Sequence, residues 1–177
     1  MIFRKTALAG VWTVEPEPLA DARGFFARTW CRHEFEARGL DPALAQCSVS
    51  GSRRRGTVRG MHFQAAPHAE AKLVRCTRGA VYDVALDVRR GSPTFGRWVA
   101  AELTADNHRM LYVPAGVAHG FQTLVDDAEV FYQISEVHHP ESERGVRWDD
   151  AGAAIAWPVA DVTVSPRDAG LPHLADL

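Results

Sequence analysis

The stretch Ala80-Val81-Tyr82-Asp83-Val84-Ala85-Leu86-Asp87-Val88 alternates regularly between two sets of side chains. Successive side chains of a β-strand point to opposite faces, so one face carries Tyr82, Val84, Leu86 and Val88, and the other Val81, Asp83, Ala85 and Asp87. The first face is expected to lie in a hydrophobic core, and the second faces either solvent or a polar cavity. The turn signals Thr77-Arg78-Gly79 and Arg90-Gly91-Ser92-Pro93 bound the stretch, which therefore predicts one β-strand.

Similar short runs, separated by turn signals, recur along the chain. They predict further strands at residues 10–14, 72–77, 98–103, 110–113, 119–124, 128–135 and 162–165. One helix is expected at residues 32–38, ended by Gly39. Many short strands with close turns are typical of a sandwich or barrel, and a double-sheet jelly roll with one or two short helices is the expected fold. The absence of a linker or repeat predicts a single domain over residues 1–177.

Composition narrows the classes of function. The chain has 177 residues, 46% of them hydrophobic and 24% charged, with a net charge of −2 and a pI near 6.4. A chain with this net charge has no overall positive charge that would favour nucleic-acid binding. No apolar run in the sequence predicts a signal peptide or a membrane span. Cys31, Cys47 and Cys76 are widely spaced and odd in number, so we expect buried free thiols in a cytoplasmic protein.

The stretch Arg59-Gly60-Met61-His62-Phe63-Gln64 carries the first candidate catalytic group. Histidine is the side chain that accepts a proton near neutral pH, and a histidine base needs its second nitrogen held by an acceptor. Asp83 and Asp168 are both candidates for that acceptor. The alternative is a histidine of the core that bonds only to backbone, and the neighbouring Arg59 and Lys72 favour catalysis.

Two further residues extend this set. Lys72 lies in an otherwise apolar run, where it is either an edge-strand charge that discourages aggregation or a cation that stabilises a developing oxyanion. Tyr132 shares a strand face with Val130 and Ile134, so its ring is expected to point inward, where a phenol can donate a proton to a carbanion or enolate. His119 is a second candidate for an inward-facing histidine.

Two other kinds of site are weighed against this set. The triplet Arg53-Arg54-Arg55 is either a solvated loop or a phosphate site, because guanidinium groups match phosphate oxygens. A metal site of the kind found in jelly-roll oxygenases would need two histidines and a carboxylate. Gln64 stands two residues after His62, where such sites usually have a histidine or aspartate, so no metal and no cofactor is expected.

The order of these motifs resembles the dTDP-4-dehydrorhamnose 3,5-epimerase family of the cupin superfamily. The resemblance covers nearly the whole chain and is carried by Asp21-Ala22-Arg23-Gly24-Phe25-Phe26, Gln46-Cys47-Ser48-Val49-Ser50, Gly56 to Gln64, Lys72-Leu73-Val74, Asp83 to Arg89, Gly91 to Gly96, His119-Gly120-Phe121, Val130-Phe131-Tyr132, Trp148-Asp149-Asp150, Trp157-Pro158 and Ser165-Pro166-Arg167-Asp168.

This resemblance implies a metal-independent jelly-roll homodimer that epimerises a nucleotide-linked 4-keto-6-deoxyhexose, with residues 1–14 as a plausible exchanged strand. His62 matches the family's base, Asp168 the carboxylate that orients it, and Tyr132 the acid on the opposite face of the sugar. Lys72 is expected near the C4 oxygen. The substrate-binding residues implied are Arg23, Phe26, Gln46, Ser48, Arg59, Asp83, His119 and His138.

The chain departs from the family's usual pattern at several of these positions. Ser48 replaces an asparagine, Arg28 replaces an acidic residue, Gln133 replaces a lysine, and Val137-His138 replaces an aromatic pair. The last change bears on stacking against the nucleotide base. Three readings therefore stay open: a 3,5-epimerase, an epimerase that acts at C3 only on a related nucleotide sugar, and a non-catalytic cupin that binds a sugar nucleotide.

Overall fold

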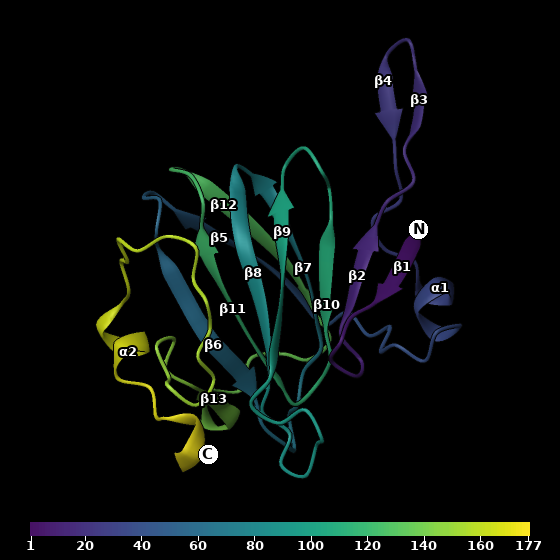
Figure 1. The fold of residues 1–177 in the computed structure, drawn as a ribbon. Coiled ribbons are helices and arrows are strands. Elements are labelled where there is room, and N and C mark those ends of the chain that lie inside the picture. Colours follow the sequence, from purple (N-terminus) through teal and green to yellow (C-terminus); the bar gives the residue numbers. More distant parts are fainter.

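The computed structural model describes all 177 residues. Most of its strands form two antiparallel sheets that face each other (Figure 1). The six-stranded sheet has the order β1 (Ile2–Lys5), β2 (Trp12–Glu15), β10 (Met110–Val113), β7 (Lys72–Arg78), β12 (Ala128–Ile134) and β5 (Gln46–Ser52). The five-stranded sheet has the order β13 (Glu143–Gly145), β6 (Val58–Gln64), β11 (Val117–Thr123), β8 (Ala80–Asp87) and β9 (Trp98–Thr104). The expected double-sheet jelly roll is confirmed.

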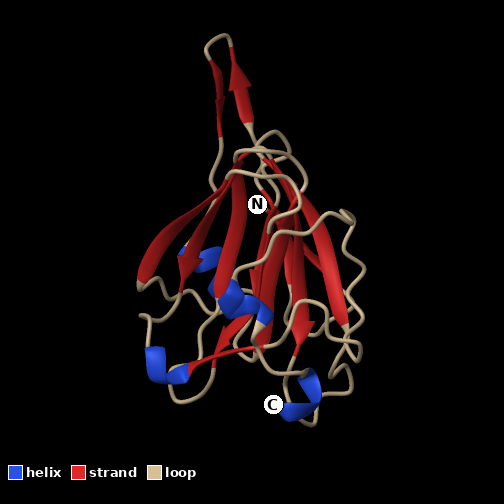
Figure 2. Ribbon diagram, turned by 90° about the vertical axis from the view of Figure 1, so that its left-hand side faces the viewer, coloured by secondary structure: helices blue, strands red, loops and turns tan.

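Helical segments are short and lie at the periphery of the sandwich (Figure 2). They are α1 (Arg32–Glu36), α2 (Pro166–Ala169) and two 3₁₀ turns, Pro140–Ser142 and Leu174–Asp176. The helix expected at residues 32–38 is α1, and the chain leaves it through Gly39 with a φ of +67°, a left-handed conformation that favours glycine. None of these helices has the length and apolar character needed to cross a membrane.

The sequence pattern locates most central strands within two residues, but it fails elsewhere. Residues 162–165 form no strand, because Thr163 makes only an isolated bridge to Thr57. The expected strands do not include β1, β5, β6, β13 or the two short strands Leu19–Asp21 and Gly24–Phe26. The β5 segment Gln46-Cys47-Ser48-Val49-Ser50-Gly51-Ser52 is polar and has few β-branched residues, and it is held as an edge strand by β12 alone.

A short hairpin of β3 (Leu19–Asp21) and β4 (Gly24–Phe26) extends beyond the end of the sandwich (Figure 1). Leu19 is 72% exposed and Phe26 is 73% exposed, so the hairpin buries little of its apolar surface within this chain. An exposed apolar hairpin of this kind is suited to contact with another molecule.

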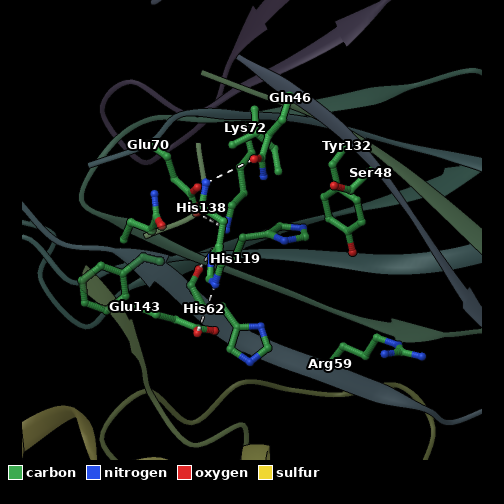
Figure 3. A pocket seen from close by; sticks show the side chains of 13 residues that line it. Gln46, Ser48, Arg59, His62, Glu70, Lys72, His119, Tyr132, His138 and Glu143 are labelled. Carbon is green, nitrogen blue, oxygen red and sulfur yellow. Dashed lines mark hydrogen bonds and ion pairs between the residues drawn. The ribbon is translucent and has the colours of Figure 1, made fainter. Parts of the chain in front are cut away.

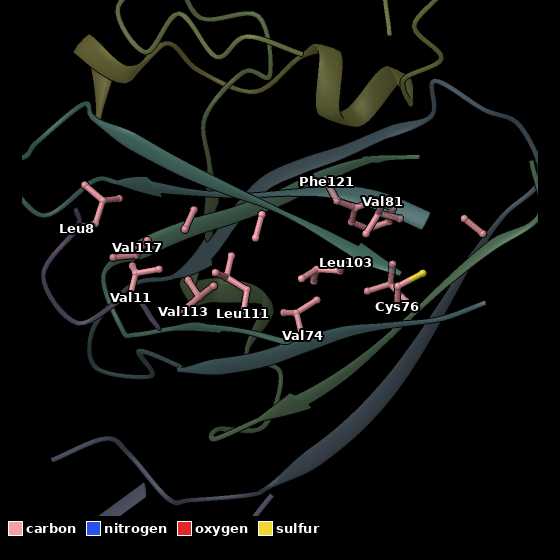
Figure 4. Packing of buried hydrophobic residues seen from close by; sticks show 14 residues of the cluster. Leu8, Val11, Val74, Cys76, Val81, Leu103, Leu111, Val113, Val117 and Phe121 are labelled. Carbon is pink, nitrogen blue, oxygen red and sulfur yellow. The ribbon is translucent and has the colours of Figure 1, made fainter. Parts of the chain in front are cut away.

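Both faces of β8 are buried, because the six-stranded sheet covers one face and the C-terminal segment covers the other. Val81 and Ala85 lie in the main core between the sheets, which Figure 4 shows. Val84 and Leu86 lie on the outer face, where they pack in a second cluster that includes Val146, Ala153 and Leu174. The expected core face is therefore buried beneath the C-terminal segment, and the solvent alternative for the Asp83 face is wrong.

Asp87 organises the turn that follows β8. Its side chain is fully buried and accepts hydrogen bonds from Arg89 Nε and Nη2 at 2.9 and 2.8 Å, and from Ser92 and Thr94 hydroxyls at 2.7 and 2.6 Å. Burial alone would raise the pKa of this carboxyl, but these donors outweigh it and hold the pKa far below its ordinary value.

All three cysteines are free, but only one fits the expected environment. Cys76 is buried in the main core, and burial raises the pKa of its thiol. Cys47 is exposed on β5 and Cys31 is partly exposed, so the expectation of buried thiols is wrong for these two. Cys47 is exposed because β5 is an edge strand and the side chains of Gln46 and Ser48, on its other face, point inward.

Candidate active site

One cavity of about 410 Å³ opens between the two sheets and gathers most of the predicted functional residues (Figure 3). Its lining comes from β5, β6, β7, β11, β12 and the adjoining loops. Eight of the predicted residues line it: Gln46, Ser48, Arg59, His62, Lys72, His119, Tyr132 and His138.

His62 is held by Asp168, which decides between the two carboxylates considered from the sequence. His62 Nε2 donates to Asp168 Oδ1 at 3.0 Å, and the backbone N–H of Gly60 donates to Asp168 Oδ2 at 3.1 Å. The Ser165 hydroxyl caps α2 by accepting from Asp168 N at 3.1 Å, which fixes the carboxylate in place. With Nε2 engaged, Nδ1 is the ring nitrogen left to exchange a proton.

The environment of Asp168 keeps it ionised. Burial would raise the pKa of the Asp168 carboxyl, but the hydrogen bonds from His62 and Gly60 outweigh burial and lower it. The carboxylate therefore accepts from His62 at neutral pH, as an orienting group for a histidine base requires.

Asp83, the other candidate, pairs instead with His119. His119 Nε2 lies 2.8 Å from Asp83 Oδ1, and both side chains are almost completely buried. Asp83 Oδ2 is buried without a hydrogen-bond partner. Burial raises the pKa of the Asp83 carboxyl, and the nearby His119 and Lys72 charges partly offset this effect. Asp83 therefore lies behind the pocket and acts on it through His119.

Tyr132 points inward as its strand parity predicts. Its ring packs edge-to-face on His119, with centroids 5.8 Å apart and an interplanar angle of 83°. Burial raises the pKa of the Tyr132 hydroxyl, and the charge of Asp83 adds to the effect. The phenol is therefore protonated at neutral pH and available as a donor.

Lys72 begins β7, which lies between β10 and β12 in the middle of the six-stranded sheet. The edge-strand explanation of this lysine is therefore wrong. Its Nζ lies 2.9 Å from Glu70 Oε1 and makes a long 3.5 Å contact to the backbone oxygen of His62. The side chain places an ammonium group on the wall of the cavity, as an oxyanion-stabilising role requires.

Polar side chains at the rim are held by backbone groups. Arg59 Nη2 donates to Gly51 O at 2.9 Å and its Nε donates to Ser52 Oγ at 3.1 Å, which ties β6 to β5. Gln46 Oε1 accepts from the backbone N–H of His138 at 3.1 Å. These contacts place a guanidinium and an imidazole at the pocket mouth.

Besides Asp83, two predicted binding residues do not line the pocket of their own chain. Arg23 and Phe26 lie on the β3–β4 hairpin, which extends away from the sandwich, and Arg23 Nη2 pairs locally with Asp21 Oδ2 at 2.5 Å. Within a single chain they therefore lie apart from the other predicted residues, and their role in holding the nucleotide stays a prediction. The sequence motif identifies the residues but does not say in which direction their hairpin points.

The arginine triplet and one group of potential metal ligands both lie away from the cavity. Arg55 Nε donates to Leu124 O at 3.0 Å, and none of the three arginines lines the cavity, which favours the solvated loop. Donor atoms of His68, His139 and Glu141 lie within 4.8 Å of one another, but these residues also stand outside the cavity lining.

The structure also adds lining residues that the sequence reasoning did not assign: Phe63, Gln64, Glu70, Ile134 and Glu143. Gln64 is buried and links two loops, because its Nε2 donates to His68 O and Val137 O and its Oε1 accepts from His139 N at 2.6 Å. Gln64 follows His62 by two residues in β6, so both side chains lie on one face of that strand.

Known proteins that resemble this chain in sequence and fold come from one family of sugar-nucleotide epimerases. Residues 5–176 match the profile of the family described as dTDP-4-dehydrorhamnose 3,5-epimerase. The chain is 44% identical over 178 residues to the dTDP-4-dehydrorhamnose 3,5-epimerase of Sinorhizobium fredii, covering 100% of this chain and 91% of the relative.

Two solved structures share the fold closely. The dTDP-6-deoxy-D-glucose-3,5-epimerase RmlC of Legionella pneumophila, in complex with dTDP-4-keto-L-rhamnose, superposes with a TM-score of 0.92 at 36% identity, over 98% of this chain and 93% of that one. ChmJ, a 3'-monoepimerase of Streptomyces bikiniensis in complex with dTDP-quinovose, gives a TM-score of 0.88 at 36% identity, over 96% and 86% of the two chains. The chain thus belongs to the dTDP-4-dehydrorhamnose 3,5-epimerase family.

Proposed function

We propose that this protein converts dTDP-4-dehydro-6-deoxy-D-glucose to dTDP-4-dehydro-L-rhamnose by moving protons at C3 and C5. The observation that carries the proposal is the grouping of His62, Lys72 and Tyr132 around one cavity, with His62 held by an ionised Asp168. Family membership and the sugar nucleotides bound to related structures support the substrate class.

The chemistry follows from the position of the ketone. C3 and C5 both flank the C4 carbonyl, so removal of either proton gives an enolate whose negative charge rests on O4. His62 takes the proton through Nδ1 while Asp168 stabilises the imidazolium that forms. Lys72 stabilises the enolate oxygen, and Tyr132 returns a proton from the opposite face, which inverts the carbon. To complete the cycle, the tyrosinate takes a proton from solvent and the His62 imidazolium releases its proton to solvent.

The remaining contacts suit a nucleotide diphosphate. Arg59 carries a guanidinium at the pocket mouth, where it can pair with phosphate oxygens, and Gln46, Ser48 and His138 line the same wall. Arg23 and Phe26 reach a substrate only if the β3–β4 hairpin of a second copy enters the pocket. We therefore propose a homodimer in which each hairpin completes the site of its partner. Three free cysteines support the cytoplasm as its location.

Epimerisation at C3 alone is the second candidate function. The departures at Ser48 and His138 both face the pocket, and ChmJ, a related 3'-monoepimerase, has the same fold. Small changes in sugar orientation decide which carbon faces the base, because proton transfer requires close and directed contact. A non-catalytic sugar-nucleotide-binding protein would need only the arginines and the cavity, and it leaves the proton-transfer set unexplained.

Incubation with dTDP-4-keto-6-deoxyglucose in deuterated water, with EDTA present, tests these alternatives. We expect NMR to find deuterium at both C3 and C5. Label at C3 alone would identify the monoepimerase. Tight binding without any label would support the binding protein, and exchange that occurs only in a parallel incubation without EDTA would contradict a metal-independent mechanism.

A further inference from the structure

The ammonium group of Lys72 has one short ionic contact. Glu70 Oε1 lies 2.9 Å from Lys72 Nζ, and the two side chains are only 8% and 12% exposed. Both lie on the wall of the cavity (Figure 3). The other contact of Nζ, to the backbone oxygen of His62, is 3.5 Å long and weak. Glu70 is therefore the main structural constraint on where this ammonium sits.

Asp83, on β8, is the other carboxylate whose charge Lys72 affects. Asp83 Oδ1 is occupied by His119, but Asp83 Oδ2 is buried and has no hydrogen-bond partner. The positive charge of Lys72 lowers the pKa of the Asp83 carboxyl and so opposes, in part, the effect of burial. Lysine carries its charge on a flexible four-carbon stem, so a Lys72 without Glu70 would lose its one short ionic contact and its fixed position.

We infer that Glu70 is a positioning residue, which holds the Lys72 ammonium at the cavity wall. The inference rests on the proposed function, in which that ammonium stabilises the enolate oxygen of the substrate. A displacement of about 1 Å at such a site costs up to about 100-fold in rate. Because the enolate forms only after the substrate has bound, loss of Glu70 lowers kcat and leaves KM largely unchanged.

Four variants and one control test the inference: Glu70→Ala, Glu70→Gln, Lys72→Met, the double variant Glu70→Ala/Lys72→Met, and Glu15→Ala. The control breaks an equally short 2.9 Å ion pair, to Arg109, outside the cavity. The readouts are kcat and KM for deuterium incorporation into the keto-sugar nucleotide, with thermal melting to verify that each variant folds.

We expect Glu70→Ala to lower kcat by about 10- to 100-fold at unchanged KM. Glu70→Gln retains an oxygen that accepts from Nζ and should recover most of the rate. Since Glu70 acts through Lys72, adding Glu70→Ala to Lys72→Met should cause no further loss. Glu15→Ala should turn over like the wild type.

Three results would overturn the inference. They are full activity of Glu70→Ala, a loss that glutamine does not restore, or an equal loss in the Lys72→Met background. A wild-type protein that exchanges no proton on any keto-sugar nucleotide would instead refute the proposed function, and the inference with it. The wild-type measurement thus separates the two failures.

Discussion

His62 and His119 are direct partners in the pairing of β6 with β11, and each is bonded to a carboxylate that stands outside the cavity lining. The carboxylates come from distant parts of the chain, Asp168 from α2 and Asp83 from β8. Two imidazoles thus share one wall of the cavity, and each has its Nε2 engaged. The hydrogen bonds to Asp168 and Asp83 therefore set the orientation of both rings before any substrate binds.

Asp168→Asn should abolish the base without disturbing the fold. Gly60 N–H donates to Asp168 Oδ2, so the asparagine oxygen is retained there and its NH₂ group turns toward His62 Nε2. His62 would then carry its proton on Nδ1 and could not accept one from the sugar. We expect kcat to fall by about 10²- to 10⁴-fold with little change in KM.

Solvent-exchange kinetics check this prediction, with Asp149→Asn as the matched control. Asp149 pairs with Arg147 Nη2 at 2.8 Å, outside the cavity lining. The control should retain wild-type turnover. An Asp168→Asn protein that exchanges at the wild-type rate would exclude His62 Nδ1 as the base.

Tyr132→Phe should separate proton removal from inversion. The base and the lysine remain, so deuterium should still wash into recovered substrate, while reprotonation from the opposite face slows. Exchange should therefore outpace formation of the epimer, and the ratio of labelled substrate to product measures the effect. Equal loss of exchange and of epimerisation would contradict the assignment of Tyr132 as the acid.

Tyr112→Phe is the control for that experiment. The Tyr112 hydroxyl accepts from the backbone N–H of Asp41 at 2.9 Å and stands outside the cavity lining. Loss of this hydrogen bond should reduce the free energy of unfolding by about 1 kcal/mol and leave the ratio of exchange to epimerisation unchanged.

Local sequence patterns identified the fold class and the inward side chains because strand parity is a property of a few neighbouring residues. Parity placed Tyr132 inside and put Gln64 on the face of His62. It could not choose between Asp83 and Asp168, because that choice depends on how α2 packs against β6. It likewise could not orient the β3–β4 hairpin, whose direction is set by no local pattern. The sequence pattern did not predict β5, because most residues of this strand are polar and have low strand propensity.

Asp87→Asn should destabilise the protein in a pH-dependent way. The folded-state pKa of Asp87 lies far below the unfolded value of about 3.9. A lowered pKa contributes stability that is fully present above pH 4 and is lost as the pH falls toward the folded value. We expect the substitution to reduce the free energy of unfolding by about 2–3 kcal/mol at pH 7, because Arg89 loses its partner.

Denaturant unfolding at a series of pH values measures this difference. The gap between wild type and Asp87→Asn should be constant from pH 7 to about 5 and should narrow below about pH 4, as the wild type loses the contribution. A gap that widens on acidification would contradict the assignment, since it would mean that the carboxyl is stabilised in its protonated form.

Gly60→Ala should damage both stability and activity, because two strands meet at this residue. Gly60 has a φ of +125°, and an added Cβ would lie 2.6 Å from Gly120 Cα and 2.8 Å from His119 O. Backbone strain and a backbone clash together should cost about 3 kcal/mol or more of unfolding free energy. Because Gly60 N–H holds Asp168, any shift of β6 should also lower kcat.

The control is Gly51→Ala, in which the added Cβ has no neighbour within 4 Å and the φ lies outside the left-handed region. Its unfolding free energy should stay within about 0.5 kcal/mol of the wild type. Chemical denaturation of both variants, alongside their exchange rates, distinguishes a general cost of replacing glycine in a strand from a specific cost at the β6–β11 contact. If Gly60→Ala were as stable as Gly51→Ala, β6 and β11 could not approach as closely as this structure has them, and the facing of His62 and His119 would lose its support.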